Sequence, residues 1–179
     1  QLVFAFDAHT GVQLWQKKFE VPLYHINTRN SYASSTPAVD AEHLYVMWLE
    51  NDDITLVALK HDGSEVWRRD VGPYEEVHGF GKSPMVVDDL VCVANDSDAE
   101  SAVVAFDRNS GEVRWKLPRK SGTTSFGTPC VLDPTAKDKQ LITSCTASGL
   151  TAIDITTGKA VWQAFEDDLT ARCVSSPIV

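Results

Sequence analysis

Short apolar segments separated by polar turns run along the whole sequence. Residues 44–49 (LYVMWL) and 103–105 (VVA) are continuously apolar, which is typical of strands that are buried on both faces of a sheet. Glycine, proline and aspartate separate these segments, as they do at the ends of strands. No segment of useful length has the 3.6-residue period of an amphipathic helix. The pattern therefore predicts an all-β protein.

Two markers repeat along the chain in the same phase. Tryptophans are spaced by 52, 48 and 47 residues, each with a glycine four residues earlier, and Ser/Thr-Pro steps recur with their prolines 47, 45 and 48 residues apart. Repeats of this length indicate stacked units of one kind. The tryptophans are Trp15, Trp67, Trp115 and Trp162, and the steps are Thr36-Pro37, Ser83-Pro84, Thr128-Pro129 and Ser176-Pro177.

The sequence around each tryptophan predicts a β-hairpin. Residues 5–15 (AFDAHTGVQLW), 105–115 (AFDRNSGEVRW) and 152–162 (AIDITTGKAVW) are close copies, and residues 58–67 are a shorter version without the aspartate. Glycine supplies the positive φ of the turn, and the aspartate is expected to accept backbone N–H groups there. We interpret these recurring residues as structural, not catalytic: Gly11, Gly63, Gly111, Gly158, Asp7, Asp107 and Asp154.

Each repeat contains four predicted strands, and radial repetition of such units protects the sheet edges in a β-propeller. The sequence signatures of WD and kelch propellers do not occur in this chain. We predict a single incomplete β-propeller of four-stranded blades, with about three full blades and partial blades at both ends. The predicted divisions are 1–35 (partial blade and loop), 36–82, 83–127 and 128–175 (blades), and 176–179 (start of the next blade).

We predict that the first residues form the third strand of one blade and that the last residues form the first strand of another. We therefore expect a partial domain whose exposed blade edges favour self-association or strand swapping.

The Ala-x-Asp-x-x-x-Gly-x-x-x-Trp pattern resembles the tryptophan-docking motif of the pyrroloquinoline-quinone-like (PQQ-like) repeat family. That family includes quinoprotein alcohol dehydrogenases and the propeller lipoprotein of the outer-membrane β-barrel assembly machinery; residues 78–131 also resemble large propellers of planctomycete bacteria. The resemblance implies that each tryptophan stacks between adjacent blades, a burial worth about 2–3 kcal/mol each. It also implies a bacterial, periplasmic or otherwise extracytoplasmic location.

The resemblance does not by itself imply a cofactor. Quinoprotein dehydrogenases carry a vicinal Cys-Cys pair and a calcium held by Glu, Asn and a catalytic Asp. No Cys-Cys step occurs in this sequence, and the other ligands have no matching positions. We predict that the chain does not bind PQQ.

Composition narrows the classes of partner. The net charge of −9 counts against nucleic-acid and anionic-membrane binding, which need basic surface. No apolar run reaches the ~20 residues of a membrane-spanning helix, and no signal peptide is visible at the first residues. The cysteines Cys92, Cys130, Cys145 and Cys173 form no CxxC pair, so neither a zinc nor a redox motif is predicted; a disulfide between Cys130 and Cys145 across one hairpin stays open.

The longer loops are expected to share one face with the turns between second and third strands, and to carry cations towards the propeller axis. The candidate binding residues are Arg29, His78, Lys82, Arg119, Lys120 and Arg172. His78 is followed by Gly79 and Gly81; it is either a general base or, as we favour, a side chain that stabilises a turn. Residues 95–100 (NDSDAE) offer oxygen ligands for calcium but lack EF-hand spacing, so an ordinary acidic loop is favoured and no metal site is predicted.

We interpret the chain as a non-enzymatic propeller that binds proteins or other macromolecules. The alternatives are part of a PQQ-dependent oxidoreductase, a hydrolase whose other half is missing, and a regulatory propeller fused to another domain such as a kinase.

Overall fold

The computed structural model describes residues 1–166 and 168–179, and in that part of the chain all regular structure is β-strand. Residue 167, inside the blade predicted for 128–175, lies outside the described residues. The strands are β1 Leu2–Phe6, β2 Gln13–Lys18, β3 Ala38–Val39, β4 His43–Glu50, β5 Asp53–Lys60, β6 Glu65–Pro73, β7 Met85–Val87, β8 Leu90–Asn95, β9 Ser101–Asp107, β10 Val113–Arg119, β11 Cys130–Leu132, β12 Gln140–Cys145, β13 Gly149–Asp154 and β14 Ala160–Ala164.

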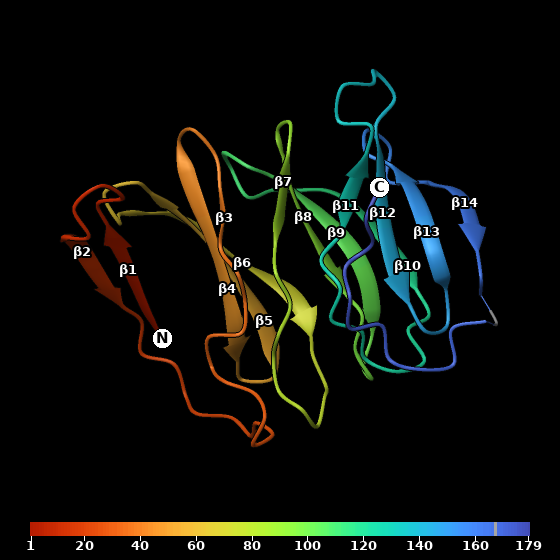
Figure 1. Ribbon diagram of the computed structural model, residues 1–179, viewed down its shortest axis with the longest axis horizontal. Helices are drawn as coiled ribbons and strands as arrows, with labels where there is room; N and C mark the ends of the chain where they lie inside the picture. Colours follow the sequence, from red (N-terminus) through yellow and green to blue (C-terminus); the bar gives the residue numbers. More distant parts are fainter. Residues whose placement is uncertain (167) are drawn as a thin grey trace.

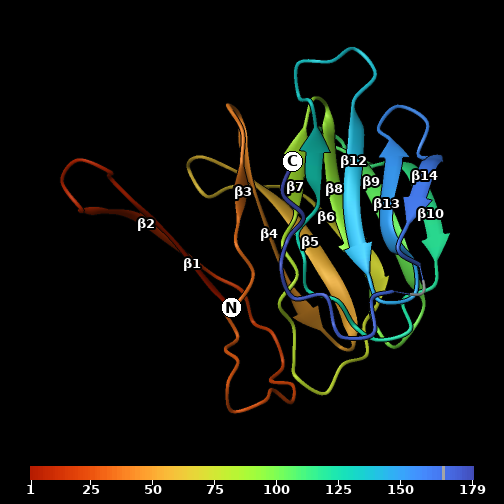
Figure 2. The ribbon, with the colours of Figure 1, turned by 45° about the vertical axis from the view of Figure 1, so that its right-hand side comes forward.

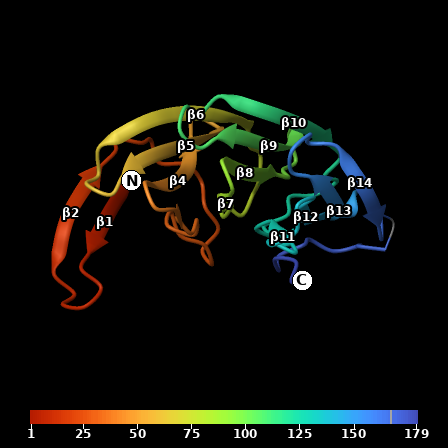
Figure 3. The ribbon, with the colours of Figure 1, turned by 90° about the horizontal axis from the view of Figure 1, so that it is seen from above.

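These strands form one two-stranded sheet, β1-β2, and three antiparallel four-stranded sheets, β3-β4-β5-β6, β7-β8-β9-β10 and β11-β12-β13-β14. We call them blades 0, 1, 2 and 3 in chain order. Figures 1 and 2 show the sheets side by side, with neighbouring strands in each sheet pointing in opposite directions. Seen from above in Figure 3, they form an open arc, with β2, β6, β10 and β14 on the outer rim and β7 and β11 towards its centre. The predicted all-β propeller of four-stranded blades is confirmed.

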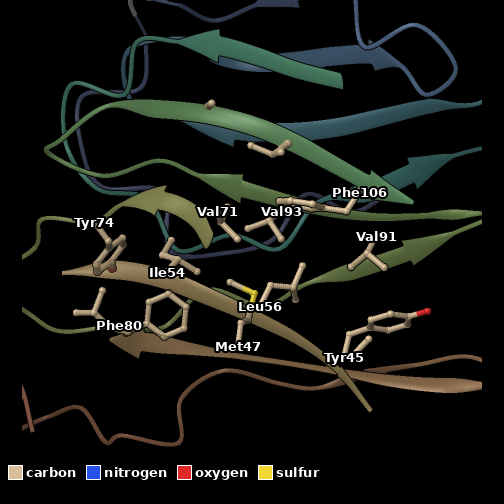
Figure 4. Close-up of a cluster of buried hydrophobic side chains, with 14 of the residues drawn as sticks. Tyr45, Met47, Ile54, Leu56, Val71, Tyr74, Phe80, Val91, Val93 and Phe106 are labelled. Atoms are coloured by element: carbon tan, nitrogen blue, oxygen red, sulfur yellow. The ribbon is translucent and has the colours of Figure 1, made fainter. Parts of the chain in front are cut away.

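Each pair of neighbouring blades encloses its own apolar core. Between blades 1 and 2, side chains of β4 and β5 such as Tyr45 and Leu56 meet Val91, Val93 and Phe106 of the next sheet (Figure 4). Similar clusters lie between blades 0 and 1 and between blades 2 and 3. Central strands are therefore covered on both faces, which explains their continuous apolar runs.

The hairpins that carry the repeated motif share one distortion. The ladder shifts register beside the tryptophan in every blade, and each indole lies opposite an alanine, in the pairs Ala5↔Trp15, Ala58↔Trp67, Ala105↔Trp115 and Ala152↔Trp162. A register shift of this kind is a β-bulge, in which one strand carries an extra residue. It twists the strand locally and changes the direction of the side chains around it. The turn itself is held by aspartate: Asp7 Oδ1, for example, accepts the backbone N–H groups of His9 and Thr10 at 3.0 and 2.7 Å.

The open question about a hairpin disulfide is settled by the register of β11 and β12. Cys130 lies opposite Ile142, three residues from Cys145, and both cysteines are free. The two thiols therefore do not face each other, and a Cys130–Cys145 disulfide is wrong for this hairpin. Within the described residues, no helix has the length and hydropathy needed to cross a membrane.

Candidate binding face formed by the inter-blade loops

Three connections leave the outer strand of a blade and cross to the inner strand of the next one, and one more segment follows the outer strand β14. The connections are residues 19–37, 74–84 and 120–129, and the last segment is residues 168–177. Figure 1 shows them at the lower edge of the molecule, together with the turns β4–β5, β8–β9 and β12–β13. We call this surface the loop face, and the opposite surface, with the tryptophan hairpins, the hairpin face. The cations singled out in the sequence lie on or beneath the loop face.

A buried ionic cluster lies beneath the loop face between blades 2 and 3. Arg119, at the end of β10, donates from Nε and Nη2 to the two carboxylate oxygens of Asp96 at 2.5 and 2.8 Å, and its Nη1 bonds the hydroxyl of Thr143 on β12. The Arg119 and Asp96 side chains are only 4% and 2% exposed. A bidentate ion pair of this kind fixes the angle between the guanidinium and the carboxylate as well as their distance. It therefore locks the β8–β9 turn to β10 and to the neighbouring blade.

Lys82 joins the same cluster from the β6–β7 loop. Its ammonium donates to the backbone oxygen of Asp96 at 2.7 Å, and the residue is 2% exposed. Burial lowers the pKa of Lys82 to about 8, although the Asp96 carboxylate acts in the opposite direction. Burial alone would also lower the pKa of Arg119, but the Asp96 carboxylate outweighs it and the pKa is raised.

A second cluster spans a still larger distance along the chain. Arg172, from the segment after β14, pairs with Glu76 of the β6–β7 loop, 96 residues away, and Nδ1 of His78 lies 2.5 Å from the other oxygen of Glu76. The Glu76 side chain is 0% exposed. Burial would raise the pKa of Glu76, but the hydrogen bonds from His78 and Arg172 outweigh it and lower the pKa to about 2. This carboxylate therefore stays ionised and ties two loops together.

The structure thus divides the six candidate residues into two groups. Lys82, Arg119 and Arg172 hold loops together through buried partners, and His78 is bonded to Glu76 although its ring is 48% exposed. Arg29 and Lys120 are exposed on the loops. Only this second pair has its charge directed to solvent, so the basic side chains do not converge on one open site.

A cleft of about 650 Å³ opens beside Lys120, between the end of β6, the β8–β9 turn and the β10–β11 loop. Its exposed charges are mixed: Lys116 and Lys120 on one side, Asp98 and Glu100 on the other. The buried carboxamide of Asn95 contributes to the wall, and its Oδ1 has no hydrogen-bond partner among the described residues. The volume lies within the range of ligand-binding clefts.

Residues 95–100 of the loop face carry the oxygen ligands that calcium takes. In the part of the chain that the structure describes, no group of three His, Cys, Asp or Glu residues is arranged to hold a metal. The acidic loop 95–100 uses Asp96 to bind Arg119, and Asp98 accepts from the amide and hydroxyl of Thr124 at 2.9 and 3.2 Å. The carboxylates of Asp96 and Asp98 are thus bound to protein donors.

The carboxylates of Glu76 and Asp96 were not expected as partners of the candidate cations. A signal was present in the repeat. Arg119 follows its tryptophan by four residues, where blades 0 and 1 place Phe19 and Val71, both buried in the core. A charge at a core position of a repeat needs a buried partner, because an unpaired buried ion is costly.

Comparison with known proteins agrees with this architecture. The fold and the repeat define a β-propeller of the PQQ-like repeat type. The family model described as "Outer membrane protein assembly factor BamB" matches residues 1–173, and the chain belongs to this family.

Individual relatives are distant and longer. The chain is 29% identical over 135 residues to the quinoprotein alcohol dehydrogenase PedH of Pseudomonas putida, covering 69% of this chain and 21% of that protein. Its fold is similar to BamB from Moraxella catarrhalis (TM-score 0.59, 23% identity, 91% of this chain and 46% of that one). It is also similar to the quinohemoprotein alcohol dehydrogenase of Comamonas testosteroni (TM-score 0.64, 16% identity, 91% and 32%). The chain thus spans less than half the length of each of these relatives.

Proposed function

We propose that the chain is part of a non-enzymatic, extracytoplasmic propeller that binds another protein through its loop face. The observation that carries the proposal is the pair of buried ionic clusters, which hold loops from different parts of the chain in one arrangement. A surface that is rigid before binding loses less conformational entropy when a partner docks.

The use of the charged groups also supports binding over catalysis. Asp96, Glu76 and Arg119 are buried and paired with charged groups of the chain itself, so they are not directed at a substrate. A general base must reach the proton that it removes, and His78 is instead held on Glu76. The family match to an assembly factor supports the same reading, and it is the ground for the extracytoplasmic location.

The cleft beside Lys120 suits an extended peptide segment from the partner. Peptide backbone offers both donors and acceptors, and the cleft offers ammonium groups, carboxylates and a carboxamide oxygen. Loops on a rigid scaffold are common sites of protein recognition. The exposed Arg29 extends the same face towards blade 0.

Site-specific photo-crosslinking tests this function. A photoreactive residue is placed at Lys120 or Arg29 on the loop face, and at Asn109 in the β9–β10 turn of the hairpin face as the matched control. The chain is exported to a bacterial periplasm and irradiated. Discrete protein adducts from the two loop-face positions, and none from Asn109, are expected. Adducts that are absent, or equally strong from both faces, contradict the proposal.

The oxidoreductase alternative has its own readout. Purified chain is titrated with PQQ and Ca²⁺ while absorbance and dye-linked alcohol oxidation are recorded. A binding module gives no saturable absorbance change and no activity. Saturable binding with turnover would favour the enzyme.

A further inference from the structure

The repeat makes the gaps between successive blades directly comparable. The residue three positions before the motif alanine pairs across the ladder with Trp48 in blade 1, Asn95 in blade 2 and Cys145 in blade 3, so these three positions are equivalent. Side chains alternate along a strand, so the residue four after each tryptophan faces the following blade and the residue one after it faces the preceding blade. Each gap is bounded by one residue of each of these three kinds.

Between blades 0 and 1, the chain's own side chains fill this space. The rings of Phe19 and Trp48 lie 4.7 Å apart between centroids, and the guanidinium of Arg68 lies over both, at 5.4 and 5.7 Å. Arg68 also pairs with the carboxylate of Glu50 at 3.6 Å, and this carboxylate accepts from the indole N–H of Trp48 at 3.3 Å. Aromatic, cationic and anionic groups thus satisfy one another within this gap.

The equivalent space between blades 1 and 2 is open and forms part of the cleft beside Lys120. Valine replaces phenylalanine, asparagine replaces tryptophan and lysine replaces arginine, and a serine stands at the position of the glutamate. All four of these residues line the cleft. They are Val71, Asn95, Lys116 and Ser97, at the positions of Phe19, Trp48, Arg68 and Glu50.

Between blades 2 and 3, the space is filled again, this time by polar groups. Arg119, four residues after its tryptophan, is bound there by Asp96 and Thr143. Cys145 is 0% exposed, and its thiol donates to the backbone oxygen of Lys120 at 3.3 Å. The middle gap is therefore the one whose equivalent residues leave room for a group from another molecule.

The carboxamide of Asn95 lacks one partner in this cleft. Asn95 is 2% exposed, and its Nδ2 donates to the backbone oxygen of Pro73 at 2.9 Å. Its Oδ1 accepts no hydrogen bond from the described residues. A buried acceptor without a donor is unfavourable, so a ligand that supplies an N–H group is stabilised here.

The ammonium group of Lys116 faces the same cleft. Trp115 and Leu117 pack against the core shared with blade 3, so Lys116 lies on the face of β10 directed towards blade 1. Lys116 is exposed, and it has a neutral serine where its equivalent in blade 1 has Glu50. A carboxylate from a ligand complements it. Glu100, on the opposite wall, disfavours a run of several acidic groups.

We propose, building on the proposed function, that the cleft beside Lys120 binds the partner protein at an aromatic residue next to an acidic one. The aromatic ring packs on Val71, which belongs to the apolar core between blades 1 and 2 (Figure 4). The carboxylate pairs with Lys116, and a backbone N–H of the partner segment donates to Oδ1 of Asn95. These groups replace the ones that the chain itself supplies between blades 0 and 1.

NMR titration of the ¹⁵N-labelled full chain tests the proposal. The probe is an acetylated and amidated hexapeptide with a Phe-Glu pair between glycine and serine residues. Saturable shifts are expected for the backbone amides of Val71 and Lys116 and for the side-chain amide of Asn95. Replacing the peptide's glutamate by glutamine should raise the dissociation constant about fivefold. Replacing its phenylalanine by alanine should raise it at least about tenfold.

A charge exchange identifies the ion pair. Lys116→Glu changes an exposed residue, and it is expected to weaken binding of the Phe-Glu peptide and to strengthen binding of a Phe-Lys peptide. Lys137→Glu is the matched control, because Lys137 is exposed in the β11–β12 turn, far from the cleft in sequence and on the hairpin face. It is expected to leave both dissociation constants unchanged.

Three results overturn the proposal: no saturable shifts at the cleft, equal affinity for the Phe-Glu and Phe-Gln peptides, or a Lys116→Glu chain that still prefers Phe-Glu. If photo-crosslinks from Lys120 still form with a protein, the proposed function stands and only the chemistry assigned to the cleft is wrong. If those crosslinks are absent as well, the proposed function fails with it.

Discussion

The hairpin face and the loop face of the molecule join the same blades by different means. On the hairpin face, the same indole, glycine and backbone oxygen meet between each pair of blades. On the loop face, the connections are ionic and each is unlike the others: Asp96 with Arg119 and Lys82 in one place, Glu76 with Arg172 and His78 in another.

The difference separates contacts that define the fold from contacts that are specific to this chain. A contact that recurs in every repeat determines how blades are spaced, so any substitution there affects the fold. A contact that occurs once gives one set of loops a particular shape. The loop face is therefore the part of the molecule in which a function specific to this chain is expected.

The largest expected effect tests the ionic side of the comparison. Asp96→Ala leaves the Arg119 guanidinium buried without its partner, and removal of one member of a buried ion pair costs about 3–5 kcal/mol. Urea denaturation measures the loss in the free energy of unfolding. Asp89→Ala is the matched control, since Asp89 is 60% exposed in its pair with Arg114 and such pairs contribute about 0–1 kcal/mol.

Equal losses from Asp96→Ala and Asp89→Ala would show that the buried cluster does not hold the loop face together. A second variant, Asp96→Ala combined with Arg119→Met, removes both charges of the pair and is expected to recover part of the stability.

The second prediction tests the repeated contact on the hairpin face. Gly11 and Gly111 have nearly the same backbone, with φ of 71° and 70°, so alanine at either costs about 1 kcal/mol in left-handed strain. At Gly111, the new Cβ would also lie 2.7 Å from the indole of Trp67, which brings the expected loss to about 3 kcal/mol. Urea denaturation at submicromolar concentration keeps association between chains out of the comparison. Similar losses at the two glycines would mean that the turn alone, not the indole contact, requires glycine.

The repeated side of the molecule was predictable because its signals occur several times. Trp15, Trp67 and Trp115 each follow a glycine by four residues and recur at intervals of 52 and 48 residues, so the strands, the four-stranded sheets and the propeller class followed from the pattern. Each copy of the motif served as a check on the others. At the N-terminal end, β1 and β2 form the expected half blade, whereas residues 176–179, expected to begin a further blade, form no strand.

The loop face was less predictable because its contacts join residues far apart in the sequence with no repeated spacing. Arg172 and Glu76 are 96 residues apart, and nothing in either segment indicates the other. Arg119 and Lys82 were selected as exposed binding residues, but they are buried and paired. A cation next to a strand end can bind a ligand or brace a loop, and only the fold shows whether a carboxylate lies opposite.

The smallest predicted effect concerns pH and again compares the two faces. Glu76 on the loop face has its pKa lowered from 4.5 to about 2. A carboxyl with a depressed pKa in the folded state stabilises the protein above its unfolded pKa and loses that contribution as pH falls through the folded value. We therefore expect the stability due to Glu76 to be complete above about pH 4.5 and to decline between pH 4.5 and 2, by at most roughly 3 kcal/mol in all.

Urea denaturation of the wild-type chain and of Glu76→Gln at several pH values isolates this contribution, because the other carboxyls titrate in both. The gap between the two stabilities should narrow as the solution is acidified, since the neutral amide cannot lose an ionic contact. Glu20→Gln is the control: Glu20 also has a lowered pKa, through its hydrogen bond with Lys18, but its side chain is 84% exposed. Solvent screens such a pair, so its gap should stay flat. If the Glu76 gap is flat as well, the Glu76–Arg172 pair is screened like a surface ion pair, and the loop face is not held by the charges that distinguish it from the hairpin face.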